Sequence, residues 1–307
     1  MLDHQELRAR VVAVLRFELH VERLPLLFPG LRHHGHFRFT AGGVDLEEER
    51  GICGGGGGQR HWEGKVYHRK FRIDRAARSG YSGSMKIGAA LWERGYSRLG
   101  TLLTRTECEE LRAMYADRGR FRSRIDMARF RFGQGEYQYF AYPLPDRVAD
   151  LRARLYANLA PIANQWMQAL GLPADYPGEL DRFLERCHRE GQPRPTPLLL
   201  RYRAGDYNCL HQDLYGGVAF PFQAVFCLSK PDEEFTGGEL LLVEQRPRAQ
   251  SAGHAIRLEQ GEGVVITTRY RPVKGGRGWY RTNFRHGVGP VESGERFTLG
   301  IIFHDGA

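Results

Sequence analysis

The sequence contains few cysteines, and their spacing excludes two familiar classes of small protein. The chain of 307 residues has five cysteines, with no CxxC pair and no zinc-type spacing. Disulfide scaffolds and zinc fingers need cysteines that are paired and closely spaced. The cysteines lie far apart, at positions 53, 108, 187, 209 and 227. We therefore expect reduced thiols, most of them buried.

Long apolar runs and a secretory leader are also missing. No stretch approaches the roughly 20 apolar residues of a membrane-spanning helix. Asp3 and Glu6 precede Arg8, and Arg16 interrupts the first apolar run, which does not match the pattern of a secretory signal. The expectation is a cytoplasmic protein with no membrane partner.

The charge balance is basic without being extreme. The chain holds 45 Lys and Arg against 36 Asp and Glu, a net charge of +9. Residues 1–85 contribute 14 basic and 10 acidic side chains, which leaves +5 for residues 86–307. Such a surplus is compatible with a nucleic-acid partner but does not require one. The content of 41% hydrophobic and 26% charged residues excludes a wholly disordered chain.

The first 85 residues differ in character from the rest. They contain seven of the twelve histidines and the glycine run Gly54–Gly58. Helical spacing of apolar residues occurs only over about residues 6–21. We predict a weakly structured basic extension over residues 1–85, followed by one folded domain over residues 86–307.

Within residues 86–307, helices come first and strands follow. Thr104 and Glu107 form a capping-box pattern, and apolar residues recur at helical spacing over about 146–170 and 178–189. After a proline cluster, short apolar or alternating runs separated by turn residues predict a β-sandwich or barrel. The fold class is therefore α+β, with helical support over about 86–195 and strands over about 196–307.

One short segment carries the chemistry. In an extended strand, residues two apart share a face, so His211 and Asp213 present an imidazole and a carboxylate side by side. His286, at the end of another apparent strand, is the candidate third ligand. Two histidines and one carboxylate on one face of a metal are typical of non-haem Fe(II) oxygenases. An ordinary surface contact between histidine and aspartate is the alternative.

A later strand supplies a candidate anion site. Arg296 and Thr298 share one face of this strand, whereas the apolar residues at 297, 299, 301 and 303 share the other. A guanidinium on the inner side of a sheet needs an anionic partner, and its fork binds a carboxylate in bidentate fashion. A dicarboxylate that chelates the metal at one end and contacts Arg296 at the other would fit.

These motifs resemble the 2-oxoglutarate/Fe(II)-dependent oxygenases, from about residue 91 to the C-terminus. The shared features are the H-x-D…H triad, the downstream R-x-[ST] strand and the segment Thr236-Gly-Gly-Glu-Leu240. Arg201-Tyr202, Gly205 and Leu210–Asp213 also resemble the first metal-ligand strand of AlkB-type nucleic-acid demethylases. The C-terminal region is similar to a prokaryotic oxygenase family described as acting in oxidative demethylation of damaged DNA, and hence in DNA repair.

The resemblance implies a fold, a cofactor set and site residues. The fold is a double-stranded β-helix, or jelly-roll, with supporting helices N-terminal to it. Fe(II) would be held by His211, Asp213 and His286. The co-substrate 2-oxoglutarate would be salt-bridged to Arg296, with Tyr202 and Thr298 as hydrogen-bonding neighbours.

Two positions depart from the AlkB-type pattern. Leu200 stands where that pattern has Asn, and residues 302–304 lack its second Arg. Both differences concern the metal-proximal carboxylate of the co-substrate and the substrate, not the metal ligands. Asn283 and Arg285 are candidates to compensate, although outer-face strand positions would explain them equally well.

Two basic segments are candidates for holding the substrate. Residues 118–131 contain six Arg and one Asp and are followed by aromatic residues, a combination suited to phosphates and unstacked bases. Arg122, Arg124 and Tyr139 are the candidates there, and a charged edge strand is the alternative. The second segment precedes His286 and offers Tyr280 and Arg281.

Three functions remain open from the sequence. The first is oxidative demethylation of alkylated nucleic acid, with single-stranded or damaged DNA as partner. The second keeps the same metal and co-substrate but hydroxylates a protein or small molecule, as prolyl hydroxylases do. The third is a binding module that has lost catalysis, against which the intact triad and Arg296 argue. The sequence indicates no obligate protein partner.

Overall fold

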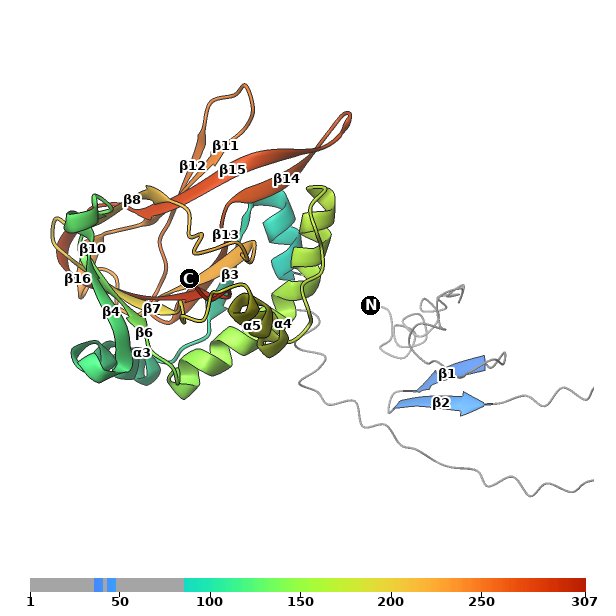
Figure 1. Ribbon diagram of the computed structural model, residues 1–307, viewed down its shortest axis with the longest axis horizontal. Coiled ribbons are helices and arrows are strands. Elements are labelled where there is room, and N and C mark those ends of the chain that lie inside the picture. Colours follow the sequence, from blue (N-terminus) through green and yellow to red (C-terminus); the bar gives the residue numbers. More distant parts are fainter. Residues whose placement is uncertain (1–35, 41–42, 48–85) are drawn as a thin grey trace, which may run out of the picture. The chain divides into compact units, whose positions relative to one another are not determined.

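The protein is described by a computed structural model, shown in Figure 1. The described residues are 36–40, 43–47 and 86–307. The helix expected over about residues 6–21 lies outside them.

Contacts between Cα atoms divide the chain into two compact units, Met1–Asp74 and Arg75–Ala307. In the first unit, β1 (His36–Thr40) and β2 (Gly43–Glu47) form an antiparallel pair. The second unit contains every candidate site residue.

The larger of its two sheets has eight antiparallel strands. Across the sheet they follow the order β3 (Tyr96–Thr101), β13 (Glu262–Thr267), β9 (Phe222–Cys227), β16 (Val291–Ile302), β7 (Leu198–Arg203), β6 (Glu136–Phe140) and β4 (Phe121–Asp126), and β10 (Phe235–Gly237) pairs with β16. Strand β4 is therefore an edge strand, as the alternative interpretation of the arginine-rich segment expected.

The smaller sheet has six strands and is also antiparallel. Their order is β12 (Ala252–Ile256), β11 (Leu240–Gln245), β15 (Gly278–Val288), β8 (Tyr207–His211) and β5 (Gly133–Gln134), and β14 (Tyr270–Gly275) pairs with β15. The hairpins β11–β12 and β14–β15 extend beyond the body of the domain (Figure 1).

From β7 onward the chain alternates between the two sheets. It passes from β7 in the larger sheet to β8 in the smaller, back to β9, across to β11 and β12, back to β13, across to β14 and β15, and returns in β16. Two facing antiparallel sheets filled by alternate strands form a double-stranded β-helix. The predicted α+β jelly-roll is confirmed.

Helices cover the outer face of the larger sheet (Figure 1). They are α3 (Arg105–Ala113), α4 (Asp146–Ala169), α5 (Leu180–Arg189) and a helical segment over residues 86–94. Trp166 and Tyr156 of α4 share one buried cluster with Phe297 of β16 and with Phe303, which directly follows that strand. Burial of each such side chain contributes about 1.5–3 kcal/mol. Because side chains alternate along β16, the opposite face of that strand turns Arg296 into the space between the sheets.

The helices begin and end close to where the sequence predicts. Thr104 accepts a hydrogen bond from the Glu107 amide at 3.3 Å, and Glu107 accepts one from the Thr104 amide at 2.8 Å, which completes the capping box. Residues 86–195 also contribute β3, β4 and β6 to the larger sheet, so this region is not purely helical.

The cysteines of the described residues are reduced, as expected from their spacing in the sequence. Cys108, Cys187 and Cys227 are buried free thiols and Cys209 is an exposed one, while Cys53 lies outside the described residues. Over the part of the chain that the structure describes, no helix is both long and apolar enough to cross a membrane.

Candidate active site

Two neighbouring strands bring the three candidate metal ligands together. His211 is the last residue of β8, Asp213 follows it, and His286 lies opposite His211 in β15. One potential ligand atom from each residue lies within 4.8 Å of the other two. Asp213 Oδ1 is 3.5 Å from His211 Nε2, and its Oδ2 is 3.2 Å from His286 Nε2. The structure thus unites the triad expected from the sequence.

Hydrogen bonds orient both imidazoles. His211 Nδ1 lies 2.8 Å from the Cys209 carbonyl oxygen. Because a carbonyl only accepts, Nδ1 carries a proton. The neutral ring therefore keeps the Nε2 lone pair for a metal ion, whereas the protonated ring donates from Nε2 to Asp213. The Gln223 amide nitrogen lies 3.0 Å from His286 Nε2. In both rings Nε2 is the nitrogen that lies next to the carboxylate of Asp213, at 3.5 and 3.2 Å.

The electrostatics of the triad suit a cation. Burial alone would raise the pKa of Asp213, but hydrogen bonds from the protonated forms of His211 and His286, together with their positive charge, outweigh it and hold that pKa well below its usual range. Burial lowers the pKa of His286. For His211 burial acts in the same direction, but the hydrogen bond to Asp213, the charge of Asp213 and the hydrogen bond to the Cys209 carbonyl together outweigh it and raise the pKa of His211. At neutral pH the carboxylate is anionic and His286 is neutral, which are the forms that bind a metal.

The donor set discriminates among metals. Two imidazole nitrogens and one carboxylate oxygen on one side of a cation leave its other positions open, as in non-haem Fe(II) oxygenases. A closed structural zinc site would present four protein ligands. Within the described residues, the triad is the one group of histidine, cysteine and carboxylate side chains with metal-binding spacing. The residues present therefore fit an Fe(II) ion with room for a co-substrate.

Arg296 faces the same cavity from β16 and is 3% exposed. Its Nη1 has no hydrogen-bond partner anywhere in the described part of the chain. Its guanidinium carbon lies 5.6 Å from the centre of the Tyr202 ring. A buried guanidinium without an anion is costly, so this position fits the far carboxylate of a dicarboxylate such as 2-oxoglutarate.

The other two expected cofactor-binding residues line that cavity as well. Tyr202 is fully buried and lies opposite Arg296 in the pairing of β7 with β16. Burial raises the pKa of Tyr202, which keeps its phenol protonated. Thr298 is 2% exposed and lies two residues beyond Arg296, on the same strand face. The cavity has a volume of about 330 Å³ and includes the triad.

Two polar side chains next to the triad were not identified from the sequence. Tyr215 Oη donates to Asp213 Oδ1 at 2.5 Å and accepts from Tyr139 Oη at 2.9 Å. Gln223 is 2% exposed, and its Oε1 has no hydrogen-bond partner among the described residues. A glutamine within the otherwise apolar strand β9 was a usable signal. For Tyr215, the only signal was its place two residues after Asp213.

The hydrogen bond from Tyr215 fixes one carboxylate oxygen and leaves the other for a metal. We expect Tyr215→Phe to weaken Fe(II) binding by about tenfold, because loss of a hydrogen bond to a metal-ligating group has effects of this size. Burial and the nearby Asp213 charge raise the pKa of Tyr215, so its hydroxyl acts as a donor. The measurement is the Fe(II) dissociation constant from anaerobic titration.

Tyr156→Phe provides the matched control. This variant also removes one buried hydroxyl, which donates to the Pro177 carbonyl at 2.9 Å, outside the cavity. It should leave the Fe(II) dissociation constant unchanged. Equal affinities for wild type and Tyr215→Phe would contradict a positioning role for Tyr215.

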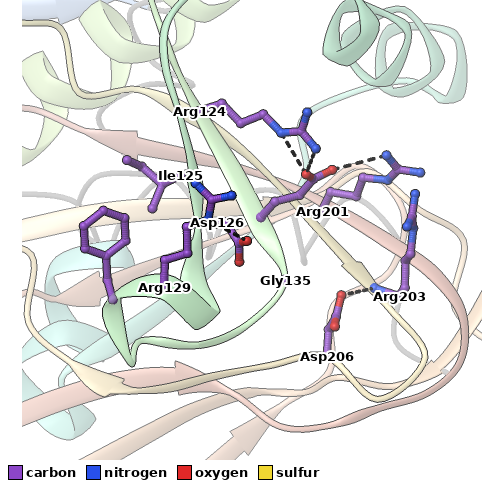
Figure 2. Close-up of a pocket in the computed structure, with 10 residues that line it drawn as sticks. Arg124, Ile125, Asp126, Arg129, Gly135, Arg201, Arg203 and Asp206 are labelled. Atoms are coloured by element: carbon purple, nitrogen blue, oxygen red, sulfur yellow. Dashed lines mark hydrogen bonds and ion pairs between the residues drawn. The ribbon is translucent and has the colours of Figure 1, made fainter.

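The candidate substrate residues of the first basic segment do not form a free cationic edge. Arg124 is ion-paired with Glu136, which also pairs with Arg201 (Figure 2). Arg122 donates to the Pro195 carbonyl at 2.8 Å and lies over the Tyr139 ring. The pocket shown in Figure 2 therefore contains arginines that are largely paired with carboxylates.

The remaining candidates occupy different surroundings. Tyr139 is 7% exposed and lines the metal-bearing cavity. Tyr280 and Arg281 are exposed on the β14–β15 hairpin, where Arg281 lies over the Tyr270 ring at 4.4 Å. The structure thus brings Tyr139 to the triad and places Tyr280 and Arg281 outside the cavity.

A double-stranded β-helix that carries a His-x-Asp…His triad and a buried arginine in one cavity defines the class of Fe(II)/2-oxoglutarate oxygenases. Residues 135–306 match the family described as "Oxygenase, catalysing oxidative methylation of damaged DNA". The chain belongs to this family. It is an oxidoreductase, a dioxygenase whose cofactors are Fe(II) and 2-oxoglutarate.

Relatives and similar structures accompany the family match. Two uncharacterized proteins of Mycobacterium tuberculosis, from strains CDC 1551 / Oshkosh and H37Rv, are each 52% identical over 168 residues, covering 55% of this chain and 72% of the relative. A Pseudomonas putida prolyl-4-hydroxylase is similar over 73% of this chain and 100% of its own, at 17% identity and a TM-score of 0.46. A 2OG-Fe(II) oxygenase family oxidoreductase from Burkholderia pseudomallei is similar over 77% and 96%, at 16% identity and a TM-score of 0.42.

Proposed function

We propose that the protein removes N-methyl groups from the bases of alkylated nucleic acid. The observation that carries this substrate assignment is an exposed pair of aromatic rings at the mouth of the metal-bearing cavity. Phe130 and Phe132 stack with ring centres 5.6 Å apart and are 53% and 47% exposed. Phe132 also lines the cavity. Exposed aromatic faces suit a base that has left its stack.

The proposal assigns specific residues to hold Fe(II) and 2-oxoglutarate. His211, Asp213 and His286 hold Fe(II), and Arg296 holds the distal carboxylate of 2-oxoglutarate with Tyr202 and Thr298 beside it. When bound, this pair converts dioxygen and 2-oxoglutarate into carbon dioxide, succinate and one hydroxyl group on a substrate carbon. On an N-methyl group the product is an N-hydroxymethyl group, which releases formaldehyde and leaves N–H on the base.

The residues of the chain control access and orientation. Apolar side chains such as Leu200, Val225 and Leu240 line the cavity, which limits water near the reacting carbon. Burial raises the pKa of Tyr139, so its hydroxyl stays neutral and the wall that meets a base carries no phenolate charge. A neutral, partly aromatic wall fits a planar base better than a charged side chain.

The domain assignment is part of the proposal. We assign the oxygenase domain to residues 86–307, preceded by a basic N-terminal extension over residues 1–85. This assignment is supported by the two sheets, the triad and Arg296, which all fall within residues 86–307.

The proposed function is tested by measuring two products, succinate and formaldehyde, in the same reaction. A single-stranded oligonucleotide with one N-methylated base should stimulate succinate formation and release formaldehyde in a 1:1 ratio to the stimulated succinate, by the stoichiometry of the reaction. The unmodified oligonucleotide of the same sequence is the control and should release no formaldehyde. Succinate formation that a proline-containing peptide stimulates and methylated oligonucleotides leave unchanged would contradict this substrate assignment.

A further inference from the structure

The two projecting hairpins carry the positive charge of the domain. We define the hairpin surface as residues 245–255 and 269–285, which contain eight basic and no acidic residues. Residues 86–307 hold 31 basic and 26 acidic side chains. Without the hairpin surface they hold 23 basic and 26 acidic side chains, so the rest of the domain is slightly acidic. The basic residues are Arg246, Arg248, Arg269, Arg271, Lys274, Arg277, Arg281 and Arg285.

Most of these cations are available to a ligand. Arg271 is buried and ion-paired with Glu244, and Arg246 lies 3.4 Å from the same carboxylate. The other six are exposed and have no ion pair within the described ranges of the chain. The arginines of the pocket in Figure 2 differ, because Glu136 neutralises two of them. Free, exposed guanidinium groups are those that bind phosphates.

Aromatic rings lie among the cations of the hairpin surface. Trp279 is 48% exposed and Tyr280 36% exposed, and Trp279 lies opposite Lys274 in the pairing of β14 with β15. Tyr270 has the guanidinium groups of Arg269 and Arg281 over its ring, at 4.3 and 4.4 Å. Cations that follow a backbone, with aromatic rings between them, are typical of surfaces that bind single-stranded nucleic acid. A surface for an acidic protein needs the cations but not the exposed rings.

The hairpin surface continues toward the metal-bearing cavity. Strand β15 contains Arg281 and Arg285 and also His286. At about 3.4 Å per residue, Arg281 lies roughly 17 Å from the triad. Alternation along the strand places Arg281 and Arg285 on the face opposite His286. A strand bound on that outer face would cross β15 and β8 toward the cavity mouth.

We propose that the hairpin surface binds the phosphate backbone of a single-stranded polynucleotide, with Trp279, which shares the outer face of β15 with Arg281 and Arg285, against its unpaired bases. This proposal rests on the proposed function, because the bound polynucleotide would be the substrate of the demethylation. Binding is measured without any reaction, so the binding proposal and the proposed function can fail separately.

The test measures binding of a fluorescein-labelled, unmodified oligothymidine to the full chain by anisotropy over a range of salt concentrations. The charge variant is Lys274→Gln/Arg277→Gln/Arg281→Gln. Each phosphate contact on a single strand contributes about 0.7 to the slope of log K against log salt. The charge variant should therefore reduce the slope by about 2 and weaken binding by at least about tenfold at low salt. Trp279→Leu should weaken binding by about fivefold or more with an unchanged slope.

A matched control removes the same charge elsewhere. Arg105, Arg154 and Arg182 are exposed on α3, α4 and α5, and each pairs with a carboxylate on its own helix. Their triple change to Gln should preserve the affinity and the slope. Far-ultraviolet circular dichroism and thermal unfolding verify the fold of every variant.

Several outcomes would overturn the proposal. One is equal loss of affinity in the control and the charge variant, and another is unchanged binding by the charge variant. Tighter binding of a duplex of the same sequence would contradict the preference for a single strand. Polyglutamate that competes with oligothymidine at equal charge concentration, together with no effect of Trp279→Leu, would assign the surface to an acidic protein. Oligonucleotide binding as expected, without formaldehyde release from any methylated oligonucleotide, would contradict the proposed function and leave the hairpin surface intact.

Discussion

Replacement of His211 by alanine should abolish the weak visible absorption that forms when Fe(II) and 2-oxoglutarate are added without oxygen. The change removes one of three ligand atoms that lie within 4.8 Å of one another. Two ligands, Asp213 and His286, are too few to hold the ion in an open site of this kind. Succinate formation should fall to background in the same variant.

Arg296→Ala should change the same absorption in a different way. The metal ligands stay in place, so the band should reach its usual intensity when enough 2-oxoglutarate is added. Truncation of one partner of a buried charge pair costs about 2–5 kcal/mol. The 2-oxoglutarate concentration that gives half of the maximal absorbance should therefore rise by at least about thirtyfold.

Arg201→Ala is the matched control for Arg296→Ala. Arg201 lies on the neighbouring strand β7, next to Tyr202, but its guanidinium pairs with Glu136 and Glu295 and does not line the metal-bearing cavity. Its removal should leave the required 2-oxoglutarate concentration unchanged. A band that neither His211→Ala nor Arg296→Ala affects would contradict the assignment of the whole site.

The convergence of the triad could be predicted because strand geometry is local. The two-residue spacing of His211 and Asp213 puts both on one face of an extended segment whatever the rest of the chain does. The position of His286 opposite His211 depends on the pairing of β15 with β8, which the family resemblance implied but no local pattern specifies. The alternation along β16 that separates Arg296 from Phe297 was also visible in the sequence.

The hydrogen bonds around the triad could not be predicted in the same way. The hydroxyl of Tyr215 meets Asp213 because the loop after β8 turns back, and Tyr139 reaches it from β6. Gln223 contacts His286 across 63 positions in sequence. Such contacts follow from the register of distant strands, which residue types alone do not determine.

The number of arginines in residues 118–131 is also a poor guide to how many of them are free to bind a ligand. Glu136 lies outside that run of arginines, and the pairing of β4 with β6 brings it to Arg124. Glu136 also meets Arg201 of β7. The segment that contains Arg277 and Arg281 has no acidic residue within it, and no carboxylate of the described residues pairs with either arginine. The distinction between the two basic segments therefore comes from tertiary pairing.

Strands β3 and β6 were missed for a related reason. Strand β3 pairs with β13, so that Tyr96 lies opposite Ile266. Strand β6 is short and begins directly after Gly135. Short strands whose partners lie far along the chain carry little local signal. The long helix α4 was predicted because its apolar stripe is sustained over many turns.

Arg152→Met should lower the free energy of unfolding by about 3 kcal/mol, the lower end of the cost of breaking a buried ion pair, because the carboxylate of Asp305 keeps its contacts with His188 and the Tyr142 hydroxyl at 2.8 and 2.9 Å. Arg152 is 1% exposed on α4 and forms an ion pair of 2.8 Å with Asp305, which is fully buried. The same guanidinium donates to the carbonyl oxygens of Ile302 and Phe303, each at 3.0 Å. These contacts join α4 to the end of β16, the strand that contains Arg296. Urea unfolding should show a lower midpoint with an unchanged slope.

Two further variants separate the buried charge from a general effect of the substitution. Arg154→Met, on the exposed side of the same helix, removes a pair with Asp150 that is 61% and 50% exposed at its two side chains. It should cost no more than about 1 kcal/mol, because exposed ion pairs contribute little. In Arg152→Met/Asp305→Asn the buried carboxylate that has lost its arginine becomes a neutral amide, so part of the lost stability should return. If Arg152→Met and Arg154→Met unfold at the same urea concentration, then apolar packing alone holds α4 to β16, and the buried ion pair contributes nothing to the position of Arg296.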